Sequence, residues 1–412
     1  MAKREMASRT EIAQRVVYWR KRRGLTRKLF ADRMGRSVSW VDMIQRGDRR
    51  LDRLSVLEQI ADVLEISIYT LIDRQQAQRT AECVDNTEVR TIRDALQRYD
   101  VITRTFSSDG PSDEPDLPRL RQQVDYAWLA FQASHYSTLG PLLGKLLVAT
   151  QHASAHLAGT AGQTAHVLLT QVYQLITSTL RKLGHHELEW LAAERGVQAA
   201  ERTENAIVIA GAAFRLVNAL GATNGAAAAV DAATASAHRL QPALDVKQPE
   251  PTSLLGHLYL QGAVWAAHQS DPHRVRDLLG EAERLAARLG GDRNDYWTAF
   301  GPTNVAIHRV SAYLALRDWP SAVQVAEQMN QHRLNLLPKE RRANHCVDVA
   351  RAYALGAKTE EAVAHLLQAD DLAPKEVRCR PITRDLVHDL WRSRRSTSAG
   401  LRQLVEQIGL PA

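Results

Sequence analysis

The sequence lacks most of the features that mark secreted, membrane-embedded or metal-stapled proteins. It has only three cysteines in 412 residues, and Cys83, Cys346 and Cys379 are far apart, so neither a disulfide framework nor a zinc knuckle is expected. No apolar run reaches the roughly 18–20 residues that a membrane-spanning helix needs. The charged residues 3–5 are not followed by the apolar segment of a secretory signal. These absences predict a cytoplasmic protein without a membrane segment.

The motifs of the common catalytic and cofactor sites are also missing. The sequence contains no phosphate-binding loop, no Gly-x-Ser-x-Gly elbow and no dinucleotide fingerprint. All fifteen histidines follow residue 134, and His152 and His156 could share a helix face. No Glu completes a His-Glu-x-x-His pattern there, however, and no cysteine pair is near. We therefore expect no catalytic residue, no cofactor and no metal site.

The basic charge of the chain is concentrated in its first sixth. The net charge is +7, and residues 1–74 alone hold 17 Lys/Arg against 10 Asp/Glu, which leaves residues 75–412 neutral. A local basic surplus is the electrostatic footprint of a protein that binds a phosphate backbone. A surface charged for solubility would show the same surplus, so charge alone leaves both interpretations open.

The same basic segment carries the periodicity and punctuation of five short helices. Gly24, Gly35 and Gly47 are placed to end the first three helices, and Thr26 and Ser37 are placed to cap the second and third. Later apolar positions add a fourth and a fifth. Since only two residues separate the second helix from the next cap, the third helix is expected to project, and a helix about 10 Å across fits the major groove of DNA.

The stretch GLTRKLFADRMGRSVSWVDMIQRGDRRLDRLSVLEQIADVLEIS and the order of elements over residues 10–73 resemble the XRE (Cro/repressor) helix-turn-helix family. The resemblance implies sequence-specific binding to double-stranded DNA. The residues that it would place at base edges or on the groove side are Val38, Ser39, Asp42 and Met43. Those that it would place at phosphates are Thr26, Arg27, Ser37 and Arg46. Those that would reach the backbone or the minor groove are Arg49, Arg50 and Arg53.

Two positions depart from the pattern of that family. Arg27 stands where the family usually has Gln, which turns a neutral phosphate contact into a charged one. Gln45 stands where the family often has a Glu paired with the arginine that corresponds to Arg20. In place of that ion pair we expect a hydrogen bond between Arg20 and Gln45.

A polar segment and then a long helical region follow. Residues 75–118 are polar, and 107–116 combine serine, glycine, proline and acidic residues without apolar periodicity, which is typical of a linker. From residue 119 onward, Ala and Leu recur at helical spacing, and breakers divide the chain into helix pairs that begin about forty residues apart, as in stacked hairpins. The expected pairs are 119–136 with 138–157, 161–183 with 186–202, 204–220 with 223–240, 252–270 with 272–290, 302–317 with 319–334, and 339–356 with 358–371, before one or two helices in 375–409.

Two of these pairs resemble tetratricopeptide repeats. The segments AYLALRDWPSAVQVAEQM (312–329) and AYALGAKTEEAVAHLLQA (352–369) have the aromatic residue, the short turn and the small residues of that repeat. We therefore predict an all-α fold with three parts. These are a five-helix helix-turn-helix bundle in 1–74, a helical or flexible linker in 75–118, and a tetratricopeptide-like α-solenoid in 119–412 that senses a signal and dimerises.

A solenoid of this kind offers a concave groove lined by the first helix of each pair. Asn218, Asn304 and Asn344 fall in such first helices, and Trp297 precedes the breaker Gly301-Pro302. The resemblance implies that asparagine amides there hold a peptide backbone, and an aromatic ring such as that of Trp297 would supply an anchor pocket. These four residues are therefore the candidates for effector binding. A simpler interpretation is that Gly301-Pro302 only starts a helix and that Trp297 packs between repeats.

Together these features predict a DNA-binding transcriptional regulator that acts as a homodimer and responds to a signalling peptide or small molecule. Two alternatives fit the same residues. The protein could be an adaptor whose repeats bind a partner protein, or a constitutive repressor whose repeats only dimerise.

Overall fold

The computed structural model describes residues 9–23, 25–46, 48, 51, 54–64, 66, 68–72, 86–97, 115–223, 225–245, 247–393 and 398–408. The chain divides into two compact units, Met1–Thr87 and Glu88–Leu410, which we call the head and the arm. Across the described ranges every regular element is an α-helix or a short 3-10 helix. The expected all-α fold is confirmed.

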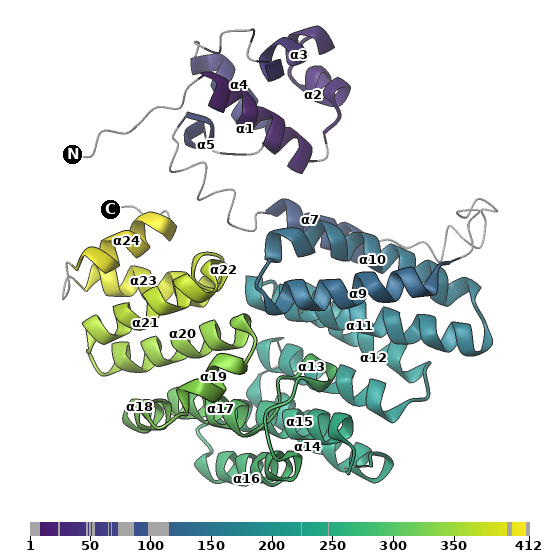
Figure 1. Ribbon diagram of the computed structural model, residues 1–412, viewed down its shortest axis with the longest axis vertical. Helices are drawn as coiled ribbons and strands as arrows, with labels where there is room; N and C mark the ends of the chain where they lie inside the picture. The colour runs from purple at the N-terminus through teal and green to yellow at the C-terminus, as the bar shows by residue number, and fades with distance from the viewer. Residues whose placement is uncertain are drawn as a thin grey trace. The chain divides into compact units, whose positions relative to one another are not determined.

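The head contains the five expected helices. They are α1 (Arg9–Arg22), α2 (Arg27–Arg33), α3 (Val38–Arg46), α4 (Leu54–Leu64) and α5 (Ile68–Ile72) (Figure 1). The predicted caps form: Thr26 Oγ1 accepts from the Leu29 amide at 3.1 Å, and Ser37 Oγ accepts from the Trp40 amide at 3.2 Å. Gly35, at φ 61°, makes the turn between α2 and α3 in the left-handed region.

One small hydrophobic core holds these helices together. Trp19 on α1 and Phe30 on α2 are almost completely buried, as are Val41 on α3 and Ile60 on α4. Trp40 is 6% exposed and belongs to this core. Because α3 buries one face in the core, its opposite face is left at the surface.

The arm is a stack of helix pairs in which each pair packs against the next (Figure 1). The pairs are α9 (Leu117–Gln132) with α10 (Tyr136–His156), α11 (Gly159–Leu183) with α12 (His186–Glu201), α13 (Ala206–Thr223) with α14 (Ala226–Leu240), α15 (Pro249–His268) with α16 (Pro272–Leu289), α17 (Pro302–Ala315) with α18 (Trp319–Glu327), and α20 (Lys339–Leu355) with α21 (Thr359–Leu372). The remaining elements are η1 (Gln241–Ala243), η2 (Asp295–Trp297), α19 (Gln331–Leu336), α22 (Pro374–Arg378), α23 (Pro381–Arg392) and α24 (Ala399–Ile408).

Most of these bounds lie within a few residues of the expected ones, with one exception. The expected helix 319–334 is two helices, α18 and α19. Asn330 begins the second one, because its Oδ1 accepts from the Arg333 amide at 3.1 Å. A side chain that caps a new helix also interrupts the preceding one.

A further helix, α7 (Asn86–Leu96), packs on the arm within the segment 75–118 that was expected to be a linker. A Cβ at Gly144 of α10 would lie only 2.8 Å from Thr91 Cγ2, so α7 and α10 are in close contact. Arg195 of α12 donates to the carbonyl of Leu96. The breaker-rich residues 107–114 lie outside the described residues.

One helix of the arm is more apolar than the sequence inspection allowed for. Among the described residues, α13 is long and apolar enough to cross a membrane by composition. Of its 18 residues, 56% are buried inside the arm, where the helix packs against α11, α12, α14 and α15. A helix that is apolar on most sides is also what the centre of a large helical stack requires.

Candidate functional site

The DNA-binding residues predicted for the head share one surface of α2 and α3. The described members that are exposed are Thr26, Arg27, Ser37, Val38, Ser39 and Arg46, and the half-buried ones are Asp42 and Met43. Arg49, Arg50 and Arg53 lie outside the described residues. The α3 face opposite the core is thus at the surface, and the DNA contacts of these residues stay predictions.

An ion pair joins the two helices on this surface. Arg27 Nη1 lies 3.2 Å from Asp42 Oδ1, with the two side chains 61% and 31% exposed. Arg46 Nε lies 3.3 Å from the Asp42 carbonyl oxygen and 3.6 Å from Asp48 Oδ2. Exposed pairs of this kind contribute little stability. A phosphate would therefore compete with Asp42 for Arg27 at small cost.

The hydrogen bond expected between Arg20 and Gln45 is not formed. Arg20 instead donates to the carbonyl of Leu25, because the short loop after α1 brings that carbonyl within reach. The Gln45 amide nitrogen has no partner within the described part of the chain. Burial, followed by the nearby Arg27 charge, lowers the pKa of Arg20.

In the arm, the first helices touch the last ones directly. The Tyr136 hydroxyl on α10 donates to a carboxylate oxygen of Glu376, 240 residues away. Lys182 on α11 lies 3.1 Å from the other Glu376 oxygen and also pairs with Glu340 on α20. Arg380 lies 2.9 Å from the same Glu376 oxygen as Lys182. The row of helix pairs is therefore closed on itself.

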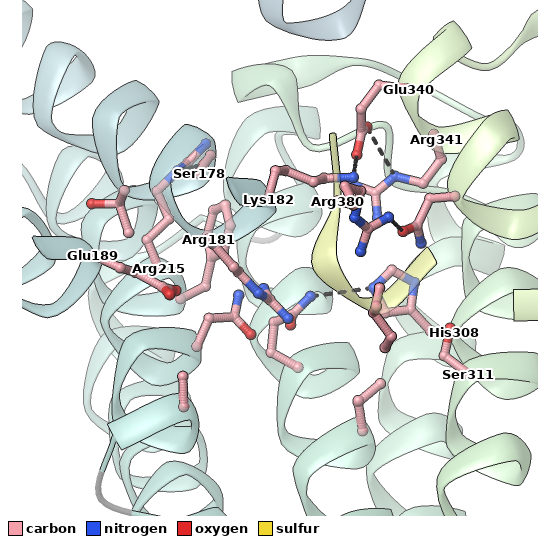
Figure 2. Close-up of a pocket in the computed structure, with 18 of the residues that line it drawn as sticks. Ser178, Arg181, Lys182, Glu189, Arg215, His308, Ser311, Glu340, Arg341 and Arg380 are labelled. Carbon is pink, nitrogen blue, oxygen red and sulfur yellow. Dashed lines mark hydrogen bonds and ion pairs between the residues drawn. The ribbon is translucent and has the colours of Figure 1, made fainter. Parts of the chain in front are cut away.

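This closure encloses a cavity of about 450 Å³ along the inner side of the arm (Figure 2). Its walls come mainly from α11, α13, α15, α17 and α20, the first helices of consecutive pairs, and residues of α9, α12, η2 and α23 also contribute. The volume is within the range of about 300–1,000 Å³ that is usual for small-molecule sites. The lining holds six Lys/Arg side chains but only three Asp/Glu, so the cavity is positively charged.

Most of these charges are paired with each other. Burial by itself would raise the pKa of Glu340, but the adjacent Lys182 and Arg341 lower it to about 2. Arg351 Nη1 lies 3.3 Å from Asp348 Oδ1. Figure 2 shows Lys182, Glu340 and Arg341 gathered on one side of the cavity.

Arg215 on α13 differs, since no carboxylate pairs with it among the residues that the structure describes. It is 5% exposed, and Nη1 donates to the Gly211 carbonyl at 2.8 Å. The guanidinium carbon lies 4.2 Å from the Phe214 ring centroid and 4.9 Å from that of Trp128. Burial lowers the pKa of Arg215 to about 9. Aromatic faces, rather than an acid, therefore stabilise this cation.

Arg181 on α11 likewise forms no ion pair within the described ranges. Its side chain is accessible from the cavity, yet protein surrounds it, and this removal from bulk water lowers its pKa. The carboxylate that acts on it most strongly is Glu189. That carboxylate is bound to His186 instead, with 2.9 Å between Oε2 and Nδ1.

A glutamine and two histidines form an uncharged part of the wall. His308 Nδ1 lies 2.9 Å from the Asn304 carbonyl oxygen, so Nδ1 carries the proton and Nε2 is an acceptor. The Gln261 amide nitrogen lies 3.2 Å from Nε2 of both His308 and His257 and can donate one hydrogen to each. Burial lowers the pKa of His308 to about 3 and that of His257 well below its usual value. Both rings are therefore neutral near pH 7.

The segment between α16 and α17 crosses to α9 in a strained conformation. Tyr296, Trp297 and Ala299 all have φ between 49° and 60°, in the left-handed region. Trp297 stacks on Trp128 of α9, with centroids 5.7 Å apart and planes 8° from parallel. Such strain persists only where surrounding contacts hold it, and it concentrates at functional sites.

Three of the four residues predicted to bind an effector line the cavity: Asn218, Trp297 and Asn344. Their roles in binding stay predictions. Asn304 is not part of the lining, because its side chain is completely buried and its amide nitrogen donates to the Thr298 carbonyl at 3.4 Å. Its position in the groove is thereby corrected: Asn304 is buried beneath the wall, one helical turn from His308, which does line the cavity.

Comparison with known proteins bears on the head. No family model matches the chain. Over 85 residues, 21% of this chain and 77% of the relative, it is 27% identical to the HTH-type transcriptional regulator SinR of Bacillus subtilis strain 168. With the five helices and both caps in place, the earlier resemblance is confirmed. The head is a helix-turn-helix unit similar in sequence to that regulator.

Solved structures with a similar course of the chain were also found. Aspartyl phosphate phosphatase F of Bacillus subtilis has a TM-score of 0.44 and 11% identity, covering 89% of this chain and 95% of that one. PlcR of Bacillus thuringiensis, in complex with the peptide PapR7 and DNA, has a TM-score of 0.30 and 13% identity, covering 68% and 96%. ComR of Streptococcus suis has a TM-score of 0.27 and 14% identity, covering 94% and 96%.

The arm residues that sequence inspection missed are its unpaired cations, Arg181 and Arg215. One signal was available, since Arg215 is the only charged residue in the apolar stretch that forms α13. A charge in such a stretch either has a partner elsewhere or serves a ligand. No group of three or more His, Cys, Asp or Glu side chains suited to a metal occurs among the described residues, and the expected lack of catalytic residues and cofactors stays a prediction.

Proposed function

We propose that the protein is a sequence-specific DNA-binding transcriptional regulator whose head contacts the major groove through α3. The observation that supports this most directly is the exposed face of α2 and α3 in a head similar in sequence to SinR. The basic surplus of residues 1–74 supplies the attraction to phosphates. Such a protein acts in the cytoplasm, as the sequence also predicts.

The arm, in this proposal, is the sensor. Its cavity is lined by helices from early and late repeats at once, so a bound effector would contact both ends of the closed stack. An effector that binds one curvature of the repeats more tightly would shift the arm toward that curvature. The coupling free energy in such cases is typically about 1–3 kcal/mol. A signalling peptide or a small molecule fits this scheme.

Homodimerisation is the third part of the proposal. A single small head buries too little surface for the affinity typical of a specific regulator, and two-fold symmetric binding to two half-sites is the usual solution. Light scattering on the full chain at micromolar concentration is expected to show a dimer. A monomer under those conditions would contradict this part alone.

The test of DNA binding is a mobility shift with the full chain on fragments of its own promoter and on unrelated duplexes. Arg46→Ala is expected to weaken binding to every duplex and to lower the salt slope by about one ion. Ser39→Ala is expected to alter preference among sequences instead. Arg276→Ala, at an exposed position of α16, is the matched control. Equal binding to all duplexes would refute the assigned base contacts.

The effector is tested by repeating the shift with culture extract. A change in affinity supports a sensor. An affinity that never responds would favour the constitutive repressor, and a chain that binds no duplex but retains a protein partner through the arm would favour the adaptor.

A further inference from the structure

We infer that the arm cavity binds an organic anion that carries a flat apolar group, held by Arg181 and Arg215 against the tryptophan pair Trp128 and Trp297. This deepens the proposed sensor function and rests on it. The ligand class follows from the charge left unpaired in the wall, the aromatic surface beside it and the volume available.

The unpaired charge is specific to these two arginines. Lys182 and Arg380 share the Glu376 carboxylate, and Arg351 pairs with Asp348. Arg341 Nε lies 3.9 Å from Glu340 Oε2. These cations are neutralised inside the wall and do not attract a further anion.

Arg215 is the costlier of the two unpaired arginines. A guanidinium remains charged at any physiological pH, and a buried cation without a counter-ion is destabilising. Its contacts within the wall are the Ser178 hydroxyl at 3.4 Å, the Gly211 carbonyl and two aromatic faces. None of these carries a negative charge. A ligand anion would supply the charge that is missing.

Arg181 faces the same space from the neighbouring helix pair. Both arginines line the cavity together with His257, and, after burial, His308 and Arg341, their charges also lower the pKa of that ring. Figure 2 shows Arg181 reaching from α11 into the middle of the cavity. Because His257 and His308 are neutral, they add no cation of their own to the cavity.

The apolar part of the ligand is assigned from the rings. Trp297 and Trp265 line the cavity and are half-buried, and Trp128 lies almost parallel to Trp297 and supports it from behind. Flat rings prefer stacked or edge-on contacts with such surfaces. The volume of about 450 Å³ admits a small molecule or the end of a short peptide rather than a folded partner.

The same chemistry has two possible sources, a free aromatic acid or the C-terminal carboxylate of a short peptide. The test uses the full chain and the fluorescent probe anilinonaphthalene sulfonate, with its neutral counterpart N-phenylnaphthylamine. The sulfonate is expected to bind about 10-fold or more tightly than the neutral probe, as one charged hydrogen bond provides. Indole acetate and the tripeptide Gly-Gly-Trp then compete, each as free acid and as amide.

Displacement by either free acid, but by neither amide, supports the inference and identifies the source. Arg181→Gln and Arg215→Gln are expected to weaken sulfonate binding about 10-fold or more, while Arg276→Gln leaves it unchanged. Arg181 is accessible and forms no ion pair, so that variant remains informative if Arg215→Gln fails to fold. Equal binding of both probes, competition by the amides, competition by neither acid, or full sulfonate affinity in Arg181→Gln would each overturn the inference.

DNA binding is measured separately on the same samples. If the anion binds as described and the mobility shift on promoter DNA does not respond, the anion site stands and its coupling to the head is refuted. If the chain binds no DNA while the probe results hold, the regulator proposal fails and the ligand class is unaffected.

Discussion

Replacing His308 by glutamine is expected to make the arm less sensitive to acid. Burial in α17 lowers the pKa of His308 to about 3, with the Arg341 and Arg181 charges acting in the same direction and Asp348 and the Asn304 carbonyl opposing them. Below pH 6.5, the ordinary pKa of a histidine, His308 is protonated in the unfolded chain but stays neutral in the folded arm. The free energy of unfolding therefore decreases as the pH falls from 6.5 toward 3, and His308 causes no such loss above pH 6.5.

The magnitude follows from the interval between the two pKa values. Each pH unit inside it costs about 1.4 kcal/mol, so that His308 alone removes about 2 kcal/mol from the free energy of unfolding at pH 5. Glu340, whose pKa is lowered to about 2, contributes stability that is lost only below about pH 4.5. The window from pH 7.5 to 5 therefore excludes the contribution of Glu340.

The assay is urea unfolding of the arm transition at pH 7.5 and pH 5, followed by tryptophan fluorescence. His308→Gln is expected to lose about 2 kcal/mol less than the unmodified chain between these two values, whatever its stability at pH 7.5. The other buried histidines contribute to both proteins and cancel in the difference. His238→Gln, at an exposed position of α14, is the control. An equal loss in the His308 variant and the unmodified chain would show that His308 is not held neutral.

Three further predictions concern the head and the packing of the arm. Asp42→Asn removes a negative charge from the groove side and releases Arg27, so mobility shifts should show tighter binding to all duplexes and a salt slope steeper by about one ion; unchanged binding would contradict the role of that pair. Gly256→Ala places a Cβ 2.0 Å from a buried phenylalanine ring and should lower the free energy of unfolding by about 1–3 kcal/mol. Gly280→Ala is the control, because a Cβ there has no atom within 4 Å. This variant should raise the free energy of unfolding by about 0.5–1 kcal/mol. Tyr136→Phe removes a buried hydrogen bond between the first and last repeats and should cost about 1–3 kcal/mol in urea unfolding; a neutral result would mean that this contact does not hold the arm closed.

The sequence was sufficient for the features that local chemistry controls. Thr26 and Ser37 mark helix starts in the head because a cap satisfies amides only three residues away. Gly35 marks the turn because it adopts the left-handed conformation without strain. The helix pairs of the arm could be read from breakers and periodicity for the same reason. Where a local signal was overlooked, as at the Asn330 cap, the predicted helix was too long.

The site in the arm depended on contacts that no local pattern records. Asn304 looked like a groove residue because it follows a helix start, but only packing decided that its side chain is completely buried. Arg215 and Trp128 are 87 positions apart in the numbering, and their contact exists only because the repeats curve until α9 meets the inner wall. The closure through Glu376 and Tyr136 spans 240 residues. The apolar periodicity of the helices determines that such a stack forms. Small rotations summed over successive repeats determine where its two ends meet. That meeting point decides which charges are paired inside the arm and which are left for a ligand.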